Sequence, residues 1–124
     1  MTNLFSSIKI FAKIAPKIKV IDYARLDALQ GDVLVNCTPV GMFPKVEAAP
    51  VSAEVSFAFN ASVDLIYNPA QTLFLKQAAE AGNKAVNGLF MLVAQAVAAQ
   101  EIWQGERYDS DLIVRIMSEL EKRI

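Results

Sequence analysis

Two sequence patterns alternate between residues 62 and 104, and this alternation limits the fold more than any other feature of the chain. A short apolar run at residues 62–67 is followed by apolar residues at helical spacing over residues 72–81. A second short run, Lys84–Val86, is followed by the long helical pattern of Leu89–Gln104. Strand, helix, strand and helix in this order are typical of a parallel sheet with covering helices. The sequence therefore predicts an α/β fold.

Turn-forming residues mark the ends of these predicted elements. We expect Asn68 to cap the helix over residues 72–81, with Pro69 in its first turn, where a missing N–H has no consequence. Gly82 can end that helix in the left-handed conformation. Asn87 and Gly88 form the bend into the long helix.

The N-terminal third predicts further helices and one more strand. An amphipathic helix is expected over residues 3–15, ended by Pro16. Residues 17–21 alternate like a short strand, and Asp22 is expected to cap a helical turn through residue 29. The apolar stripe of the first helix consists of Leu4, Phe5, Ile8, Phe11, Ala12 and Ala15.

The remaining segments complete the expected order of elements. Residues 32–36 are expected to form a short buried strand of the kind found inside parallel sheets. Residues 38–50 are expected to form a loop, because they contain one glycine and three prolines, and one helical turn is expected at residues 50–54. A last amphipathic helix is expected over residues 110–123, capped by Asp109 or Ser110.

Polar residues and a glycine follow the predicted strands. Ligands of open parallel sheets bind outside the carboxyl ends of the strands, and those ends carry Thr38, Tyr67 and Gly88. Thr38 offers a hydroxyl and a backbone N–H, Tyr67 offers a hydroxyl on a rigid ring, and Gly88 lets the backbone approach a ligand closely. Each has an ordinary structural explanation alone, but together they suit a polar ligand beside a flat ring.

Gln95 interrupts the apolar face of the long predicted helix. On a helical wheel it lies among Met91, Leu92, Ala98, Ala99 and Ile102. A buried amide without a partner would be unfavourable by about 1–3 kcal/mol. The amide therefore either bonds to nearby backbone or faces a ligand cleft.

Composition excludes several classes of function. The chain has 124 residues, which suits one domain, and its net charge of −1 gives no electrostatic reason to bind nucleic acid or an anionic membrane. No apolar run is long enough for a transmembrane helix. Histidine is absent and Cys37 is the single cysteine, so we expect no histidine-based catalytic triad and no metal site in this chain. A lone cysteine fits a cytoplasmic location.

Three motifs in the right order resemble the C-terminal half of shikimate dehydrogenase. They are Asn36-Cys37-Thr38-Pro39-Val40-Gly41-Met42, Asp64-Leu65-Ile66-Tyr67-Asn68-Pro69 and Asn87-Gly88-Leu89-Phe90-Met91-Leu92-Val93-Ala94-Gln95. The resemblance covers residue 22 to the C-terminus and, more weakly, the first twenty residues. It implies a partial Rossmann-like parallel sheet with flanking helices, and it favours the cleft explanation for Gln95.

The resemblance also implies roles for six residues. Thr38, Leu65, Gly88 and Met91 correspond to positions that bind NADP, with the last three near its nicotinamide half. Tyr67 and Gln95 correspond to positions that contact the substrate. The family reaction is reversible hydride transfer between NADPH and 3-dehydroshikimate, which gives shikimate, and the cofactor supplies the redox chemistry.

Other family features have no match in the sequence. The catalytic lysine–aspartate pair of the substrate domain is missing, and no glycine-rich G-x-G-x-x-G turn is present to hold a pyrophosphate. The resemblance therefore implies that the chain carries no catalytic residue. The family's Asn-Arg-Thr motif binds the 2′-phosphate of NADP, and only its asparagine has a counterpart in this chain, Asn3. We therefore expect residues 1–124 to form a single, truncated nucleotide-binding domain that lacks the first βα phosphate-binding unit and is nearly inactive alone.

The same gaps predict an exposed sheet edge. In the usual strand order, two strands would lie between residues 17–21 and residues 32–36. Their absence leaves an apolar edge on residues 32–36, which we expect to be covered by residues 17–21 or, as a homodimer, by a second copy of the chain. The sequence leaves three alternatives open: a non-catalytic remnant or self-associating fragment, a quinate rather than shikimate substrate, and NAD rather than NADP.

Overall fold

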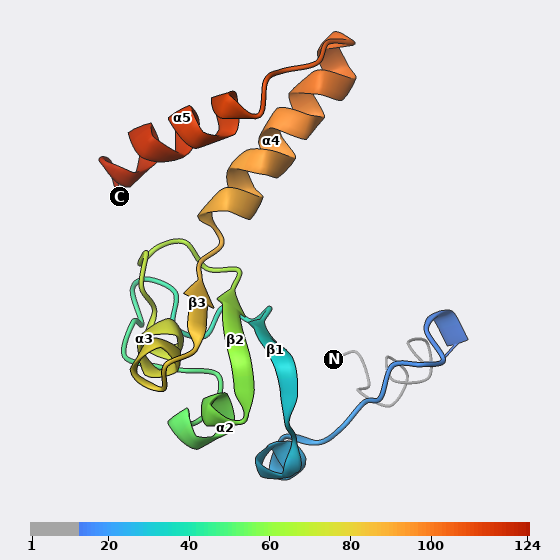
Figure 1. Ribbon diagram of the computed structural model, residues 1–124, viewed down its shortest axis with the longest axis vertical. Coiled ribbons are helices and arrows are strands. Elements are labelled where there is room, and N and C mark those ends of the chain that lie inside the picture. Colours follow the sequence, from blue (N-terminus) through green and yellow to red (C-terminus); the bar gives the residue numbers. More distant parts are fainter. Residues whose placement is uncertain (1–12) are drawn as a thin grey trace.

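A parallel three-stranded sheet forms the centre of the fold in the computed structural model, which describes residues 13–124 (Figure 1). The strands are β1 (Gly31–Asn36), β2 (Phe59–Asp64) and β3 (Lys84–Val86), in the order β1-β2-β3. Helices connect each strand to the next, as parallel pairing requires. This arrangement confirms the predicted partial Rossmann-like sheet with flanking helices.

Two helices cover one face of the sheet. They are α2 (Ala53–Phe57), between β1 and β2, and α3 (Leu73–Glu80), between β2 and β3, and they also contact each other. Buried apolar side chains of these helices form the core beneath the sheet: Val55, Phe74, Leu75 and Ala78. A 3₁₀ helix, η1 (Tyr23–Ala28), precedes β1.

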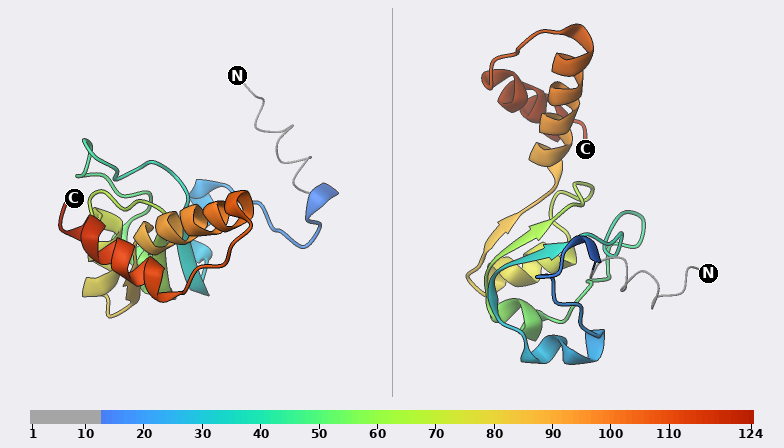
Figure 2. Two further views of the ribbon diagram at one scale, coloured as in Figure 1. Left: turned by 90° about the horizontal axis from the view of Figure 1, so that it is seen from above. Right: turned by 90° about the vertical axis from the view of Figure 1, so that its right-hand side faces the viewer.

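The last two helices form a hairpin that extends away from the sheet (Figures 1 and 2). They are α4 (Leu89–Gln104) and α5 (Asp111–Glu121), which pack against each other. The buried stripe of α4 meets the apolar stripe of α5 and makes a second core. Its members are Leu89, Val93 and Val97 together with Leu92, Leu112, Ile113, Ile116, Met117 and Leu120.

The predicted strand at residues 17–21 is wrong. Pro16 and Lys17 form a turn, and the segment that follows pairs with no strand in the part of the chain that the structure describes. Ile18 and Val20 are exposed, since no neighbouring strand is present to accept them. The helix predicted over residues 3–15 lies outside the described residues except for its last turn, where Lys13 and Ile14 are helical.

The strand β1 forms where the sequence predicts a strand, but it is not buried. β1 is the edge strand, since it pairs only with β2 within residues 13–124. Val33 and Val35 are 52% and 47% exposed, because α2 and α3 lie on the other face of the sheet. The expected apolar edge is therefore present, and residues 17–21 do not cover it. Asp22 caps η1 as predicted, and its Oδ1 accepts from the N–H of Ala24 at 3.1 Å.

The boundaries around β2 and α3 differ from the prediction. β2 ends at Asp64, three residues before the expected end, and α2 lies at Ala53–Phe57 rather than at residues 50–54. The expected cap by Asn68 is wrong, because Thr72 caps α3: its Oγ1 accepts from the N–H of Leu75 at 3.3 Å. Asn68 and Pro69 belong to the loop before that helix.

The structure of the C-terminal half agrees more closely with the prediction from the sequence. Gly82 has a φ of 83°, as expected of a left-handed helix end, and β3 and α4 have the predicted limits. In the turn before α5, Asp109 supplies the side-chain acceptor, since its Oδ1 accepts from the N–H of Asp111 at 3.1 Å. No helix among residues 13–124 combines the length and apolarity that crossing a bilayer requires.

Candidate functional site

A pocket of about 440 Å³ opens at the carboxyl ends of β1 and β2. This is the edge at which parallel sheets bind their ligands. The lining comes from the loop after β1 and the loop after β2: Cys37, Thr38, Pro39, Met42, Phe43, Leu65, Ile66, Tyr67 and Asn68. The structure thus brings together three of the six predicted site residues, Thr38, Leu65 and Tyr67.

A buried hydrogen-bond network joins the strand ends from which the two loops of this pocket start. Asn36 and Asp64 are the last residues of β1 and β2, they are register partners, and Asn36 Nδ2 donates to Asp64 Oδ1 at 3.1 Å. Asp64 Oδ1 also accepts from the N–H of Ile66 at 3.0 Å, and its Oδ2 accepts from Thr72 Oγ1 at 2.6 Å. Asn36, Asp64 and Thr72 are all buried. The network therefore ties two strand ends to the start of α3.

The two donors of Thr38 are used within the protein. Its backbone N–H and its hydroxyl both donate to Asn36 Oδ1, at 3.0 Å and 2.7 Å. The hydroxyl oxygen accepts from the N–H of Val40 at 3.3 Å. The hydroxyl and N–H that the sequence offers at Thr38 thus hold the loop in a tight turn, and the Thr38 side chain forms part of the pocket wall.

Tyr67 and Asn68 are the polar side chains that remain available on the rim. Tyr67 is 39% exposed, and neither its hydroxyl nor the Asn68 amide makes a hydrogen bond to any residue that the structure describes. Asn68 was expected as a helix cap and as one of the residues at the strand ends, but not as a site residue. Its place after a strand, beside Tyr67, is the signal that could have marked it as a pocket residue.

Gly88 is required by the backbone of Leu65. A Cβ at Gly88 would lie 2.0 Å from the carbonyl oxygen of Leu65, which no side chain can tolerate. The N–H of Gly88 donates to the carbonyl of Ile66 at 3.0 Å. The glycine thus locks the β3–α4 turn onto the loop that carries Leu65 and Tyr67, which explains this residue without a ligand.

Met91 and Gln95 do not line the pocket. Both lie on an exposed face of α4, and Met91 is 48% exposed. The Gln95 amide donates to the carbonyl of Leu92, in its own helix, at 3.0 Å. Within residues 13–124 the Gln95 amide is therefore bonded to nearby backbone, and it is exposed rather than buried among its apolar neighbours. The buried stripe of α4 is the one formed by Leu89, Val93 and Val97.

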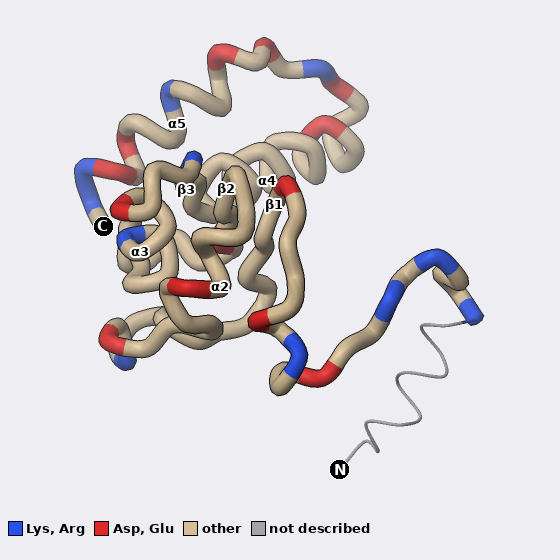
Figure 3. The backbone as a smooth tube through the Cα atoms, turned by 60° about the horizontal axis from the view of Figure 1, so that its bottom comes forward, with Lys and Arg blue, Asp and Glu red and all other residues tan. Residues whose placement is uncertain are grey.

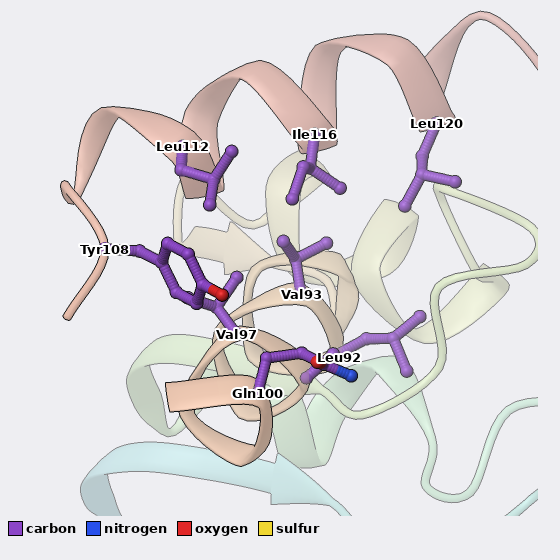
Figure 4. A pocket seen from close by; sticks show the side chains of 9 residues that line it. Leu92, Val93, Val97, Gln100, Tyr108, Leu112, Ile116 and Leu120 are labelled. Atoms are coloured by element: carbon purple, nitrogen blue, oxygen red, sulfur yellow. The ribbon is translucent and has the colours of Figure 1, made fainter. Parts of the chain in front are cut away.

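A second pocket lies between α4 and α5 (Figure 4). Its volume is about 280 Å³, and its walls are apolar side chains of the hairpin, with Gln100 and Tyr108 as the polar members. The side chains of Val93, Leu112 and Ile116 face one another across it (Figure 4). It is a gap in the packing of the two helices, and its lining contains none of the six predicted site residues.

The first pocket fits an uncharged ring better than a phosphate. None of its nine lining residues is charged, and the Lys and Arg residues lie elsewhere, as on the segment before η1 and along α5 (Figure 3). Apolar walls from Leu65 and Met42, with polar groups on the rim, suit a flat ring such as nicotinamide. A pyrophosphate would need a helix N-terminus or cations, which this lining does not supply.

The parallel sheet, its helices on one face and a pocket at the strand ends define a Rossmann-like nucleotide-binding domain. Comparison with known proteins then shows what this domain is similar to. The chain is 42% identical to shikimate dehydrogenase (NADP(+)) of Clostridium beijerinckii over 96 residues, which are 77% of this chain and 36% of that protein. No protein-family model matches the sequence.

Solved structures give the same result. The chain superposes on a chorismate mutase/shikimate 5-dehydrogenase fusion protein from Clostridium acetobutylicum with a TM-score of 0.86 and 50% identity, covering 94% of this chain and 43% of that one. A shikimate dehydrogenase in complex with NADP+ matches with a TM-score of 0.62 and 36% identity, over 71% of this chain and 31% of that one. The chain is therefore a relative of the shikimate dehydrogenases, matched over their NADP-binding domain, and it spans about two fifths of the length of those relatives.

Proposed function

We propose that this chain forms the nucleotide-domain wall of a shikimate dehydrogenase active site. The observation that carries the proposal is the pocket that joins Thr38, Leu65 and Tyr67 at the carboxyl ends of β1 and β2, in a chain 42% identical to such an enzyme. The reaction would be reversible hydride transfer between NADPH and 3-dehydroshikimate. The cofactor would supply the redox chemistry when bound, as NADPH for reduction and NADP+ for oxidation, and the chain's own residues would supply position and shape.

Each residue's proposed part follows from its surroundings. Leu65 presents an apolar surface to the nicotinamide ring, and Thr38 holds the opposite loop in place through Asn36. Tyr67 has a hydroxyl free to bond a substrate carboxylate or hydroxyl. Gly88 sets the distance between this loop and the start of α4, where Met91 and Gln95 would join the site once a substrate domain closes over that helix face.

We further propose that residues 1–124 alone are nearly inactive. Nothing in the sequence matches the lysine–aspartate pair that moves the hydroxyl proton, and the pocket has no charged side chain that could replace it. Activity would require a region that supplies the substrate domain. The test is the change in absorbance on NADP+ reduction by shikimate, with the chain alone and with the N-terminal portion of the Clostridium beijerinckii relative added. Turnover only in the mixture supports the proposal, whereas strong turnover by the chain alone contradicts it.

Ligand binding can be tested without turnover. A ligand that binds the folded state raises the melting temperature, by an amount set by its concentration relative to Kd. We expect NADP+ and shikimate to raise the melting temperature at millimolar concentration, and Tyr67→Phe to reduce the response to shikimate. The matched control is Tyr23→Phe, which alters a tyrosine that is 65% exposed on η1. Parallel titrations with NAD+ and quinate test the two alternative ligands.

A second candidate is a non-catalytic fragment that associates with itself. It is favoured by the edge of β1 with which no strand among residues 13–124 pairs, and by the bond of the Gln95 amide to its own helix. Exposed apolar strand edges promote pairing between chains. A flat thermal response up to millimolar ligand, together with a dimer in analytical ultracentrifugation, would support this candidate over the enzyme. A clean monomer with a ligand response would reject it.

A further inference from the structure

The chain leaves all three strands through the same kind of turn. Asn36 ends β1, Asp64 ends β2, and Asn87 directly follows β3. In each case a side-chain oxygen accepts from the backbone N–H two residues later: Asn36 from Thr38 at 3.0 Å, Asp64 from Ile66 at 3.0 Å and Asn87 from Leu89 at 3.1 Å. Such Asx turns fix the direction of the backbone. The three exits therefore have set directions at the edge of the sheet where the first pocket opens.

The side chains of these turns also bond to other segments, and Asp64 makes most of these bonds. Its Oδ1 accepts from Asn36 Nδ2 at 3.1 Å, and its Oδ2 accepts from the Thr72 hydroxyl at 2.6 Å. Asn87 Nδ2 donates to the carbonyl of Ala70, in the loop after β2, at 3.0 Å. Asp64 is fully buried. One carboxyl group thus holds the end of β1, the turn after β2 and the start of α3.

Tyr67 lies in a stretch whose backbone is held on both sides. Three hydrogen bonds flank it: from the Ile66 N–H to Asp64 Oδ1 at 3.0 Å, from the Gly88 N–H to the Ile66 carbonyl at 3.0 Å, and from the Phe43 N–H to the Asn68 carbonyl at 3.2 Å. The Ile66 side chain is buried, whereas the Tyr67 hydroxyl bonds to no residue that the structure describes. A free polar group on a fixed backbone is preorganised to bind a ligand.

We propose that Asp64 is a positioning residue of the first pocket, which sets the place of Tyr67 through the N–H of Ile66. Asp64 is not part of the lining, so it acts without touching the ligand. The identity of that ligand rests on the proposed function, but the placement of Tyr67 does not.

The chemistry of the three contacts explains why a carboxyl group is suited to this position. All three partners donate: the Asn36 amide, the Ile66 N–H and the Thr72 hydroxyl. A carboxylate accepts at both oxygens, whereas alanine accepts nothing. Asparagine keeps one accepting oxygen for the first two donors, and its NH2 group faces the Thr72 oxygen, which can accept instead. Asp64→Asn is therefore the conservative variant that retains the bond to Ile66.

The test uses the full chain with its three tyrosines replaced by 3-fluorotyrosine, so that fluorine NMR gives one signal for each. Tyr→Phe variants assign the signals. We expect a narrow Tyr67 signal in the wild-type protein and a split or broadened one in Asp64→Ala, with a Kd for shikimate raised at least about tenfold. Asp64→Asn should restore the narrow signal, and its Kd should lie within about threefold of the wild-type value.

Val55→Ala separates position from stability. Val55 is buried in α2 and is absent from the pocket lining, so its truncation destabilises the domain without reaching Tyr67. We expect an unchanged Tyr67 signal and Kd in this variant. If Asp64→Ala does not fold, as judged by circular dichroism, Thr72→Val takes its place, since it removes the hydroxyl that orients the carboxyl group and keeps the side-chain shape. It should broaden the Tyr67 signal, and Thr72→Ser should reverse that change.

Two results would overturn the proposal. One is a wild-type Tyr67 signal in folded Asp64→Ala, or in Thr72→Val where Asp64→Ala does not fold. The other is an equal change in Val55→Ala, which would show that lost stability, not position, alters Tyr67. A wild-type chain that does not bind shikimate would contradict the proposed function, and the fluorine signals would still decide whether Asp64 positions Tyr67.

Discussion

Asn36 Nδ2 donates to Asp64 Oδ1 at 3.1 Å, across the last register pair of β1 and β2, where both side chains are buried. A second pair of the same residue types, Asn60 and Asp32, joins the same two strands at 3.2 Å but is exposed to solvent. In each pair the residues are 28 positions apart. The two pairs differ in burial and in the number of further bonds, so they separate the effect of burial from that of the bond itself.

Asp64→Ala should lower the free energy of unfolding by about 3 kcal/mol or more. The substitution removes the acceptor of the Thr72 hydroxyl, of the N–H of Ile66 and of one N–H of Asn36 Nδ2, whose other N–H keeps the carbonyl of Val40. A buried group left without an acceptor is unfavourable by about 1–3 kcal/mol. Asp32→Ala removes the solvent-exposed equivalent and should change stability by no more than about 0.5 kcal/mol. Urea denaturation of both variants measures the difference. Equal effects would mean that the buried network is not a major source of stability.

Gly88→Ala should destabilise the fold by about 2 kcal/mol and displace the loop that carries Leu65. The new methyl group would overlap the Leu65 carbonyl, which is backbone and cannot rotate away, and overpacking of this kind is unfavourable by about 1–3 kcal/mol. Gly31→Ala is the control, because its Cβ would meet only the movable ring of Phe59, at 3.0 Å. Thermal unfolding with and without NADP+ checks both the stability and the pocket. Gly88→Ala with unchanged stability and ligand response would refute the close contact.

The limits of β3 and α4 could be predicted from sequence because strong local signals agree there. A continuous helical pattern starts after Asn87 and Gly88, and Gly105 ends it in the left-handed conformation.

The prediction of a strand at residues 17–21 was wrong because only one weak signal supported it. Alternation alone does not form a strand without a neighbour, and no paired strand accompanies this segment in the described structure.

The buried network at the strand ends was missed, although the sequence carries a signal for it. In β2, the polar residues Asn60, Ser62 and Asp64 alternate with Phe59, Ala61 and Val63, which places a carboxyl group on one face of the sheet. A carboxyl group at that position predicts buried partners. Thr72 was overlooked because Asn68 and Pro69 are the stronger local capping signal. The tertiary bond from Thr72 to Asp64 favours the later cap.

Glu54→Gln should lower stability slightly at neutral pH and have no effect in acid. Bonds from its own backbone N–H and from the Ser52 hydroxyl lower the pKa of the Glu54 carboxyl group, and they outweigh desolvation. Since the folded-state pKa lies below the unfolded one, the stabilisation is present above the unfolded pKa and is lost as the pH falls through the folded pKa. The urea midpoints of the wild-type protein and Glu54→Gln, measured from about pH 7 down to about pH 3, should differ at neutral pH and converge in acid. Glu80→Gln controls for the loss of one negative charge, because Glu80 is the last residue of α3 whereas Glu54 lies in the first turn of α2. A gap that widens in acid would contradict the assignment.

Gln95→Ala should leave the stability of the isolated chain unchanged within about 0.5 kcal/mol, because its amide is exposed and bonded only to its own helix. If the proposed substrate role holds, the same substitution should reduce kcat/KM by more than tenfold when a substrate domain is supplied, since lost hydrogen bonds to charged groups are worth about 1.5–3 kcal/mol. Gln100→Ala is the matched control, on a different face of α4 that lines the gap toward α5. Urea denaturation measures the first effect, and the NADP+ reduction assay measures the second. A stability loss of several kcal/mol would place Gln95 in the packing of the domain, whereas equal activity of the two variants would remove it from the substrate site.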